Sequence, residues 1–234
     1  MLGNITLIPV VGVPEIRPGD DLARLILAAA QATAPIADGD CLVVTQKVVS
    51  KAEGRLVAFD GSDESKAALI ARESRRVIRR RGALRIAETN HGFVCANAGI
   101  DLSNVEAGFA ALLPVDSDRS ARRIRDVIAS QGTSIGVIIS DTFGRPWRRG
   151  VTDVAIGVAG IKPVIDLRGT NDALGRELAV TEVCIADEVA AAAELVMGKS
   201  TGVAAAIVRG LNQEWFGPGD IGDVIRPAQD DLFR

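Results

Sequence analysis

Carboxylate, hydroxyl and guanidinium groups are gathered in residues 140–150, which read SDTFGRPWRRG. Asp141 and Thr142 follow the apolar run 135–139 directly, so we expect them at the carboxyl end of a strand, where α/β proteins commonly build binding sites. A carboxylate beside a hydroxyl can bind Mg²⁺, which keeps water and phosphate oxygens as its other ligands. Arg145 and two further arginines can hold carboxylates or phosphates in bidentate fashion. A solvated loop tip is the alternative, which a proline and a tryptophan in the same loop disfavour.

A second group of oxygen-bearing side chains lies in residues 97–104, which read NAGIDLSN. A turn of small residues can bring the backbone close to a polyphosphate. Asp101 and Asn104 could at the same time offer a carboxylate and an amide to a hard metal ion. A plain Asx-turn explains the same residue types and is the stronger interpretation when the segment is taken alone.

Two lysines follow an apolar run in residues 41–51, which we predict to form a strand as far as Val49. Alternation along that strand would put Lys47 and Lys51 on one face and Gln46 on the other. A solvated edge strand is the simpler interpretation, and a functional role for the lysines is the alternative.

The sequence GKST at residues 198–201 resembles the end of a P-loop but does not make one. Ala193 stands where the motif needs glycine, and a predicted helix precedes the run instead of a strand, so its N–H groups would not point at phosphate. We expect Gly198 to end that helix in the left-handed conformation, although another kind of nucleotide contact stays open. Asp187 and Glu188 begin the same helix, where acidic residues are normal and a metal role is the weaker interpretation.

Nucleophilic catalysis by serine or cysteine has no support in the sequence. His91 is the single histidine and has no serine or cysteine motif beside it. Cys41, Cys95 and Cys184 are far apart, odd in number and set among apolar residues. We therefore predict buried, unreactive thiols and a reducing cytoplasm.

Length and composition limit the class of protein. With 234 residues, 47% of them hydrophobic and 24% charged, the chain fits one large domain or two small interlocked ones. The net charge of −3 and the pI of 5.3 offer no electrostatic footprint for nucleic acid. We expect no signal peptide, because the start enters a strand-like run at once. We expect no membrane span either, because no apolar run reaches about 20 residues.

The elements that position these groups alternate irregularly between apolar runs, which predict strands, and helical periodicity. The predicted strands are residues 6–11, 41–49, 54–58 (a hairpin-like return), 135–140, 154–158, 164–167 and 203–208, and the predicted helices 21–33, 63–80, 119–131 and 187–197. Short strands with glycine turns are expected between residues 84 and 115. We therefore predict a mixed, irregular α/β fold of the α+β type, with mixed parallel and antiparallel sheets and flanking helices.

Five arginines lie near the predicted end of the helix 63–80, namely Arg75, Arg76, Arg79, Arg80 and Arg81. Cations at a helix end suit the helix dipole, so a solvated helix face is the favoured interpretation. A patch that attracts an anionic substrate is the alternative.

Five segments, taken in order, resemble the coenzyme F-420-0:L-glutamate ligase family. They are residues 7–21 with LIPV and VPEIRPGDD, 44–55 with VTQKVVSKAEGR, 91–101 with HGFVCANAGID, 140–150, and 180–199 with VTE and MGK. Each motif is weak by itself. Their shared order extends the resemblance from about Ile5 to the tail at 226–233, which is practically the whole chain.

The resemblance implies a γ-glutamyl ligase that uses GTP and a divalent metal, Mg²⁺ or Mn²⁺, with two ions per site and K⁺ as a further candidate. The implied metal ligands are Asp101, Asp141 and Thr142, and the implied catalytic residues are Asp101, Asp141 and Arg145. The implied nucleotide contacts are Val13, Pro14, Glu15, Ile16, Gln46, Lys51 and Asn104. Some relatives have serine in place of Gln46.

The implied reaction converts a carboxylate into an acyl phosphate with GTP, and the amine of L-glutamate then displaces phosphate from the deglutamylated coenzyme F-420 precursor. The resemblance further implies a single domain over residues 1–234, an interlocked homodimer, and no fused nitroreductase-like domain.

Two alternative functions stay open, namely another nucleotide-dependent carboxylate–amine ligase and a catalytically silent metal- or nucleotide-binding module. The intact oxygen ligands disfavour the silent module. The roles of Lys47, His91, Asp187, Glu188 and Lys199 stay unassigned, as do the number of glutamates and the choice between GTP and ATP.

Overall fold

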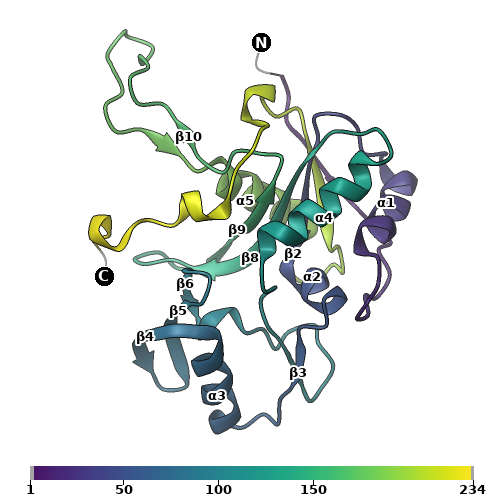
Figure 1. The fold of residues 1–234 in the computed structure, drawn as a ribbon, viewed down its shortest axis with the longest axis vertical. Coiled ribbons are helices and arrows are strands. Elements are labelled where there is room, and N and C mark those ends of the chain that lie inside the picture. Colours follow the sequence, from purple (N-terminus) through teal and green to yellow (C-terminus); the bar gives the residue numbers. More distant parts are fainter. Residues whose placement is uncertain (1–2, 233–234) are drawn as a thin grey trace.

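The computed structural model describes residues 3–232, and a mixed β-sheet forms the centre of this part of the chain (Figure 1). The strand order of the sheet is β1-β12-β2-β8-β9. The strands are β1 (Thr6–Pro9), β12 (Ala205–Arg209), β2 (Cys41–Thr45), β8 (Gly136–Gly144) and β9 (Val151–Ala159). β2 and β8 run parallel, whereas the other neighbouring pairs are antiparallel. The predicted mixed α/β fold is confirmed.

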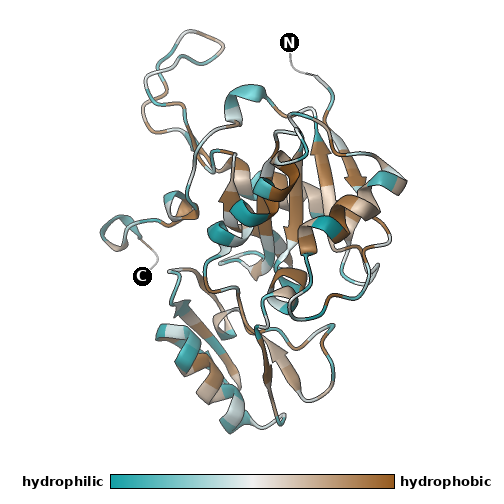
Figure 2. Ribbon diagram, turned by 45° about the vertical axis from the view of Figure 1, so that its right-hand side comes forward, coloured by the Kyte–Doolittle hydropathy of each residue, from teal (hydrophilic) through white to brown (hydrophobic). Residues whose placement is uncertain are grey.

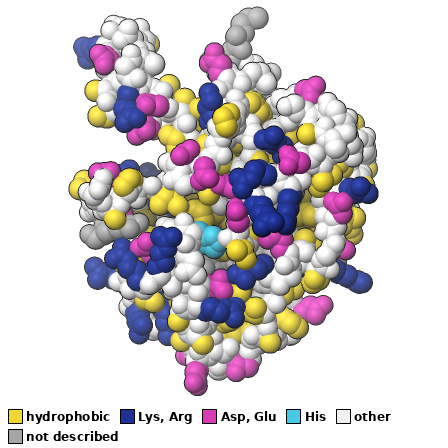
Figure 3. Space-filling view, viewed as in Figure 1, with side chains coloured by type: hydrophobic (Ala, Val, Ile, Leu, Met, Phe, Trp, Pro, Cys, Tyr) yellow, Lys and Arg dark blue, Asp and Glu magenta, His cyan; other side chains and the backbone are white. Residues whose placement is uncertain are grey.

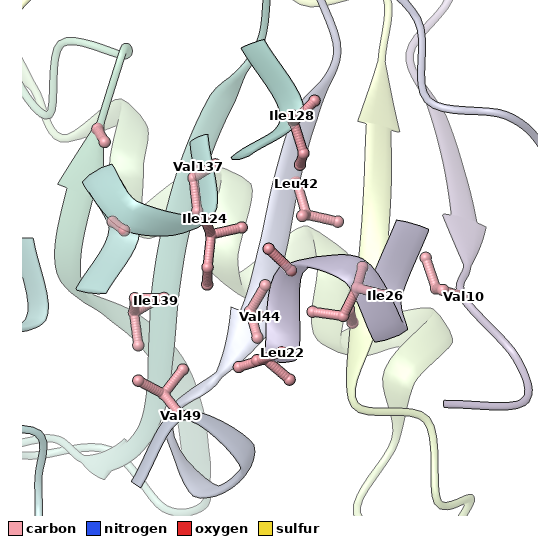
Figure 4. Packing of buried hydrophobic residues seen from close by; sticks show 14 of the residues in the cluster. Val10, Leu22, Ile26, Leu42, Val44, Val49, Ile124, Ile128, Val137 and Ile139 are labelled. Carbon is pink, nitrogen blue, oxygen red and sulfur yellow. The ribbon is translucent and has the colours of Figure 1, made fainter. Parts of the chain in front are cut away.

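Helices cover both faces of this sheet. The helices are α1 (Leu22–Thr33) and α4 (Ser117–Ala129) on one face and α5 (Ile185–Met197) on the other. Alternate residues of β2 divide between the two layers: Leu42 and Val44 pack with α1 and α4, as Figure 4 shows, while Cys41 and Val43 pack with α5. Because both faces are buried, the central strands read as continuous apolar runs (Figure 2).

The strand predicted for residues 41–49 is wrong beyond Thr45, where helix α2 (Gln46–Ala52) begins. The ladder between β2 and β8 ends at the pair Thr45–Ser140, so the following residues have no strand partner there. Val49 instead packs into the core from a helix. Lys47 and Lys51 are therefore four residues apart on a helix, which still places them on one face.

The helix predicted for residues 63–80 is wrong in its second half. Helix α3 (Asp63–Glu73) is followed by strand β4 (Ser74–Arg81), which pairs with β5 (Leu84–Thr89), and β5 pairs with β6 (Val94–Ala96). Gly82, with φ of 57°, turns the chain between β4 and β5. The arginine cluster thus lies on a strand instead of a helix end, because the hairpin pairing overrides the local helix preference of arginine. On the face in Figure 3, lysine and arginine side chains form separate groups with acidic side chains among them.

Strand β3 (Leu56–Ala58) pairs with β7 (Phe109–Ala111), so the predicted hairpin-like return of residues 54–58 is wrong. The short strands expected between residues 84 and 115 are confirmed by β5, β6 and β7. These small sheets and α3 lie at one end of the molecule, below the central sheet in Figure 1.

The loop predicted to begin at Asp141 is also shorter than expected. β8 continues to Gly144, which pairs with Val151 of β9. A register shift between Ile139 and Ser140 interrupts the ladder just before Asp141. Such an irregularity changes the direction of the side chains that follow it, and it precedes the residues expected to do chemistry.

An arm projects from the body where β10 (Ile165–Asp166) and β11 (Glu182–Val183) pair (Figure 1). Two of its apolar side chains, Leu174 and Val180, are 82% and 84% exposed. Within residues 3–232, no helix combines the length and apolar character that a membrane crossing requires.

Candidate functional site

A cleft of about 580 Å³ opens where β2 ends beside Asp141 and Thr142 of β8. Because these strands are parallel and Thr45 pairs with Ser140, the end of β2 and the part of β8 that follows Ser140 lie at the same edge of the sheet. Helix α2 starts there on one side, and Asp141 follows on the other. The polar lining includes Glu15, Lys51, Asn104, Asp141, Thr142 and Lys199. Five of these six are site residues predicted from the sequence, and they come from four distant segments.

Asp141 lies among other carboxylates in a poorly solvated position. The pKa of Asp141 is raised to about 7, and burial is the largest cause. The nearby charges of Asp101 and Asp153 contribute to the rise, while the backbone N–H of Thr142 and the ammonium of Lys47 oppose it. The two aspartates predicted to act together are therefore close enough to influence each other, although 40 residues separate them in the chain.

Asp101 is fixed by a backbone turn and by a lysine. Its backbone pairs with that of Ala111, and its Oδ1 accepts hydrogen bonds of 2.7 Å from both the N–H and the hydroxyl of Ser103. Its Oδ2 lies 2.9 Å from the ammonium of Lys47. The Asx-turn interpretation is confirmed for the Oδ1 atom, while Oδ2 faces a cation from α2. Asp101 thus serves the local turn and the site together.

The turn that carries Asp101 adopts an uncommon backbone conformation. Asn97, Ala98 and Asn104 have φ of 51°, 55° and 55°, in the left-handed region that non-glycine residues seldom occupy. Gly99 has φ of 72°, and a Cβ atom there would lie 2.7 Å from Cδ1 of Leu113. The sequence prediction for this segment was a turn of small residues that brings the backbone close to a polyphosphate, and that approach stays a prediction. The close contact that the structure shows at Gly99 is with Leu113.

Thr142 belongs to a network centred on Asp153 of β9. The Thr142 hydroxyl donates to Oδ1 of Asp153 at 2.7 Å, and the Ser140 hydroxyl donates to Oδ2 at 3.1 Å. The ammonium of Lys199 donates to the Thr142 hydroxyl oxygen and lies 2.7 Å from Asp153 Oδ1 and 2.9 Å from Glu194 Oε1. Burial alone would lower the pKa of Lys199, but its hydrogen bonds with Asp153 and Glu194 raise it, so the ammonium stays charged.

Lys51 and Glu15 close another side of the cleft. The Lys51 ammonium lies 2.5 Å from Oε1 of Glu15, and the lysine side chain is 12% exposed against 75% for the glutamate. Glu15 belongs to the segment between β1 and α1 that was predicted to contact the nucleotide. The ion pair therefore joins that segment to α2.

The structure does not bring every predicted site residue to the cleft. Gln46 is fully buried beneath it, where its Oε1 accepts from Ser50, and its Nε2 has no hydrogen-bond partner among the described residues. Arg145 is exposed in the loop between β8 and β9 and does not line the cleft. Val13 and Ile16 pack with the core, and Pro14 is exposed. Of the segment 13–16, Glu15 alone lines the cleft.

The other groups left unassigned by the sequence lie elsewhere. Nε2 of His91 faces the backbone oxygen of Pro114 at 2.9 Å. Asp187 accepts a 2.9 Å hydrogen bond from the Ala155 N–H, which supports the structural interpretation of that helix start. Burial raises the pKa of the thiols of Cys95 and Cys184 to about 12. All three cysteines are free, as predicted, but Cys184 is half-buried, whereas Cys41 and Cys95 are buried as expected.

The donor set fits a hard divalent cation with few protein ligands. Across residues 3–232, no three side chains of His, Cys, Asp and Glu form a ready-made metal cluster. Asp101 and Asp141 provide two carboxylates whose mutual repulsion a cation would relieve. Two carboxylates completed by water and phosphate oxygens are the usual environment of Mg²⁺. Asp101 and Asp141 would hold such an ion, whereas the Thr142 hydroxyl already contacts an ammonium.

Sequence reasoning missed Asp153 and Glu194 as site residues. Asp153 is 3% exposed and stands in a strand that is otherwise mostly apolar. A charged residue inside a buried strand is a usable signal, because such a group needs partners. Glu194 lies in an alanine-rich helix and gives no comparable signal. Lys199 appeared in the failed P-loop and in the MGK motif of the resemblance, in both cases without an assigned role. Gly198 before it has φ of 64° and ψ of 161°, so it ends α5 without the left-handed helical conformation expected.

The fold and the cleft define a mixed α/β protein with acidic and lysine side chains converging at one sheet edge. The family model described as F420-0:Gamma-glutamyl ligase matches residues 11–210. Coenzyme F420:L-glutamate ligase of Methanothermobacter thermautotrophicus is 43% identical to this chain, with 99% of each chain covered. The proteins of the same name from Methanopyrus kandleri and Archaeoglobus fulgidus are 40% and 42% identical, covering 100% and 99% of this chain and 100% and 97% of their own. The chain belongs to the F420-0:gamma-glutamyl ligase family.

Proposed function

We propose that this protein is a coenzyme F420:L-glutamate ligase, which joins L-glutamate to the deglutamylated coenzyme precursor through γ-linked amide bonds at the expense of GTP. Family membership over nearly the whole chain supports the ligation. The convergence of Lys51, Asn104, Asp141 and Thr142 in one cleft, with Asp101 beside it, supports the use of a phosphorylated co-substrate. This convergence is the observation that carries the proposal.

The cleft residues suit phosphoryl transfer better than covalent catalysis. Asp101 and Asp141 would hold Mg²⁺ or Mn²⁺, which neutralises phosphate charge when bound. Lys51 at the cleft wall would bind phosphate oxygens as a point charge. None of these groups acts as a nucleophile, which agrees with a reaction that depends on positioning and charge neutralisation.

The reaction proceeds in two displacement steps. A carboxylate oxygen of the precursor attacks the γ-phosphorus of GTP, the bond to the β-phosphate oxygen breaks, and GDP leaves. The free amine of L-glutamate then attacks the acyl carbon, the bond to the phosphate oxygen breaks, and inorganic phosphate and one proton are released. The lysines of the cleft would stabilise the negative charge of both leaving groups.

A product assay tests this function. Purified protein is incubated with the deglutamylated coenzyme, L-glutamate, Mn²⁺ and either GTP or ATP, and the products are followed by mass spectrometry and phosphate release. We expect glutamylated coenzyme and one phosphate per amide bond. In parallel reactions the deglutamylated coenzyme is replaced by other carboxylic acids. Glutamate-dependent phosphate release with one of those acids, and none with the coenzyme, would favour another carboxylate–amine ligase. Nucleotide binding without product or phosphate would favour a silent binding module.

We also propose a homodimer. The projecting arm between β10 and β11 carries Leu174 and Val180, which are 82% and 84% exposed and which a second copy could cover. Hairpin arms of this kind suit an interlocked contact with a second copy. Sedimentation at micromolar concentration should give twice the chain mass of 24.5 kDa. A single species of chain mass would contradict the dimer.

A further inference from the structure

The ammonium of Lys199 occupies a position made for a cation. Three oxygens from three elements surround it: Oδ1 of Asp153 on β9 at 2.7 Å, Oε1 of Glu194 on α5 at 2.9 Å, and the hydroxyl oxygen of Thr142 on β8. Two carboxylates and a hydroxyl are hard oxygen donors of the kind that Mg²⁺ and Mn²⁺ use. The lysine nitrogen lies at hydrogen-bond distance from oxygens of the kind that ligate such an ion.

The oxygens of this position are fixed by contacts of their own. Asp153 is 3% exposed, and hydrogen bonds of 3.1 Å and 2.7 Å from Ser140 and Thr142 orient its two oxygens. The Thr142 hydroxyl has its hydrogen directed to Asp153, so its oxygen faces Lys199 with a lone pair. Because each of these side chains is oriented by a hydrogen bond from a neighbour, their geometry is fixed before a ligand binds.

The backbone turn that delivers Lys199 is equally constrained. Gly198 ends α5 with φ of 64°, and a Cβ atom there would lie 2.9 Å from Cγ2 of Thr201. The Thr201 hydroxyl donates to the Met197 backbone oxygen, which closes the turn. A side chain at position 198 would be both strained and crowded. The chain is therefore held in the conformation that brings Lys199 back over β8 and β9.

We propose that Lys199 is a built-in cation of the cleft, which takes the place beside Thr142 and Asp153 that a second divalent ion would otherwise fill. The nucleotide-free protein then binds one divalent ion per chain, at Asp101 and Asp141, instead of the two per site that the family resemblance implies. This inference rests on the proposed metal dependence. A fixed ammonium would keep one positive charge beside the phosphates at any metal concentration, whereas a bound ion would be lost when the metal is scarce.

Counting bound metal tests the proposal without measuring activity. Mn²⁺ binding is measured by equilibrium dialysis and calorimetry on the nucleotide-free full chain. The variants are Lys199→Ala, which empties the position, and Lys199→Met, which keeps the side-chain length without a hard donor. Lys162→Ala is the matched control, because Lys162 is exposed and donates to the Glu214 backbone oxygen. Circular dichroism and thermal melting check that each variant is folded.

We expect Lys199→Ala to bind one more Mn²⁺ per chain than the wild type, and Lys162→Ala to bind the same number. Adding Asp153→Asn to Lys199→Ala should remove the additional ion, because it removes a carboxylate from the vacated position. Equal stoichiometry in wild type and both Lys199 variants would overturn the proposal, whatever the absolute number. The number of Mn²⁺ ions bound by the wild type tests the proposed metal dependence separately. A value of zero would contradict metal binding at Asp101 and Asp141. The difference in bound Mn²⁺ between the wild type and Lys199→Ala would still decide the role of Lys199.

Discussion

The ammonium of Lys47 lies 2.9 Å from Oδ2 of Asp101, and this ion pair joins helix α2 to the turn before β7. Both side chains keep access to solvent, with 21% of Lys47 and 25% of Asp101 exposed, so losing this ion pair should cost only about 1 kcal/mol or less. We predict that Asp101→Asn melts within a few degrees of the wild type without ligands, because the Asx-turn can be kept by asparagine. The variant should lose most of the stabilisation that GTP with Mn²⁺ gives the wild type.

Differential scanning fluorimetry with and without 1 mM Mn²⁺ and GTP measures both effects. Asp126→Asn is the control, because Asp126 lies on the exposed face of α4, away from the cleft. It should retain the full ligand-induced shift. A wild-type shift in Asp101→Asn would remove this residue from the metal site.

Asp141 should make the protein less stable as the pH rises. Its pKa is raised to about 7 in the folded state, above the value of about 3.9 expected for an unfolded chain. Between these values the folded state binds the proton more tightly, so the free energy of unfolding decreases with pH, and the decrease is complete above pH 7. From pH 5 to pH 8 this group alone should cost about 2–3 kcal/mol. The Asp141→Asn variant should lack this pH-dependent change in the free energy of unfolding.

Urea denaturation of wild type and Asp141→Asn at pH 5 and pH 8, with EDTA present, isolates the contribution of this group. Asp141→Asn should be the more stable of the two at pH 8, and the gap should narrow at pH 5. Mn²⁺ should bind the wild type more weakly below pH 7, because the metal competes with the proton. A gap that is the same at both pH values would contradict the raised pKa.

Much of the fold was predictable because buried segments consist mainly of apolar residues, which the sequence shows directly. The apolar runs of β1, β2, β8 and β12 and the periodicity of α1, α4 and α5 gave elements close to those observed. The errors arose at Thr45 and Glu73, where a strand and a helix join without a turn residue between them. The local sequence pattern does not show where such a strand and helix meet, because the position of the junction depends on strand pairing with a distant segment.

The site was predictable to the extent that its residues form recognisable motifs. Asp101, Asp141 and Thr142 were predicted in this way, and the structure places Asp141 and Thr142 in the cleft with Asp101 beside them. Asp153 was missed because its contact with Thr142 is made across the β8–β9 hairpin, between residues that are distant in the local sequence pattern. The sequence placed Thr142 in a loop, whereas the register shift before Asp141 and the continued ladder put it on a strand opposite Asp153.

Gly157 of β9 should not tolerate a side chain. A Cβ atom there would lie 2.5 Å from both the carbonyl carbon and Cβ of Ser117 at the start of α4. The backbone conformation is not the obstacle, so the cost of Gly157→Ala is steric, and we expect a loss of about 1–3 kcal/mol in unfolding free energy. Gly144→Ala on β8, where no atom lies within 4 Å of the added Cβ, should change stability by less than about 0.5 kcal/mol. Equal denaturation midpoints for the two variants would contradict the packing of α4 on β9.

Lys51 and Glu15 should affect nucleotide binding in opposite directions. The ion pair of 2.5 Å occupies the lysine when the cleft is free, and a phosphate oxygen must compete with Glu15 for the ammonium. The glutamate is 75% exposed, so the pair is screened by solvent and is worth only about 0.2–1 kcal/mol. Glu15→Gln should therefore tighten binding of a non-hydrolysable GTP analogue by up to about fivefold. Lys51→Met removes a charge-assisted contact and should weaken binding by about tenfold or more.

Isothermal titration with the GTP analogue and Mn²⁺ at low ionic strength measures both variants. Glu182→Gln is the matched control, since it removes the same charge from a surface pair with Arg168 on the arm. That variant should bind like the wild type, which separates the effect of the Lys51 pair from the change in net charge. Raising the salt concentration should shrink the gain of Glu15→Gln, because the competing ion pair is itself weakened by screening. Weaker binding in Glu15→Gln would mean that Glu15 contacts the nucleotide directly, and the competition between glutamate and phosphate for Lys51 would then be wrong.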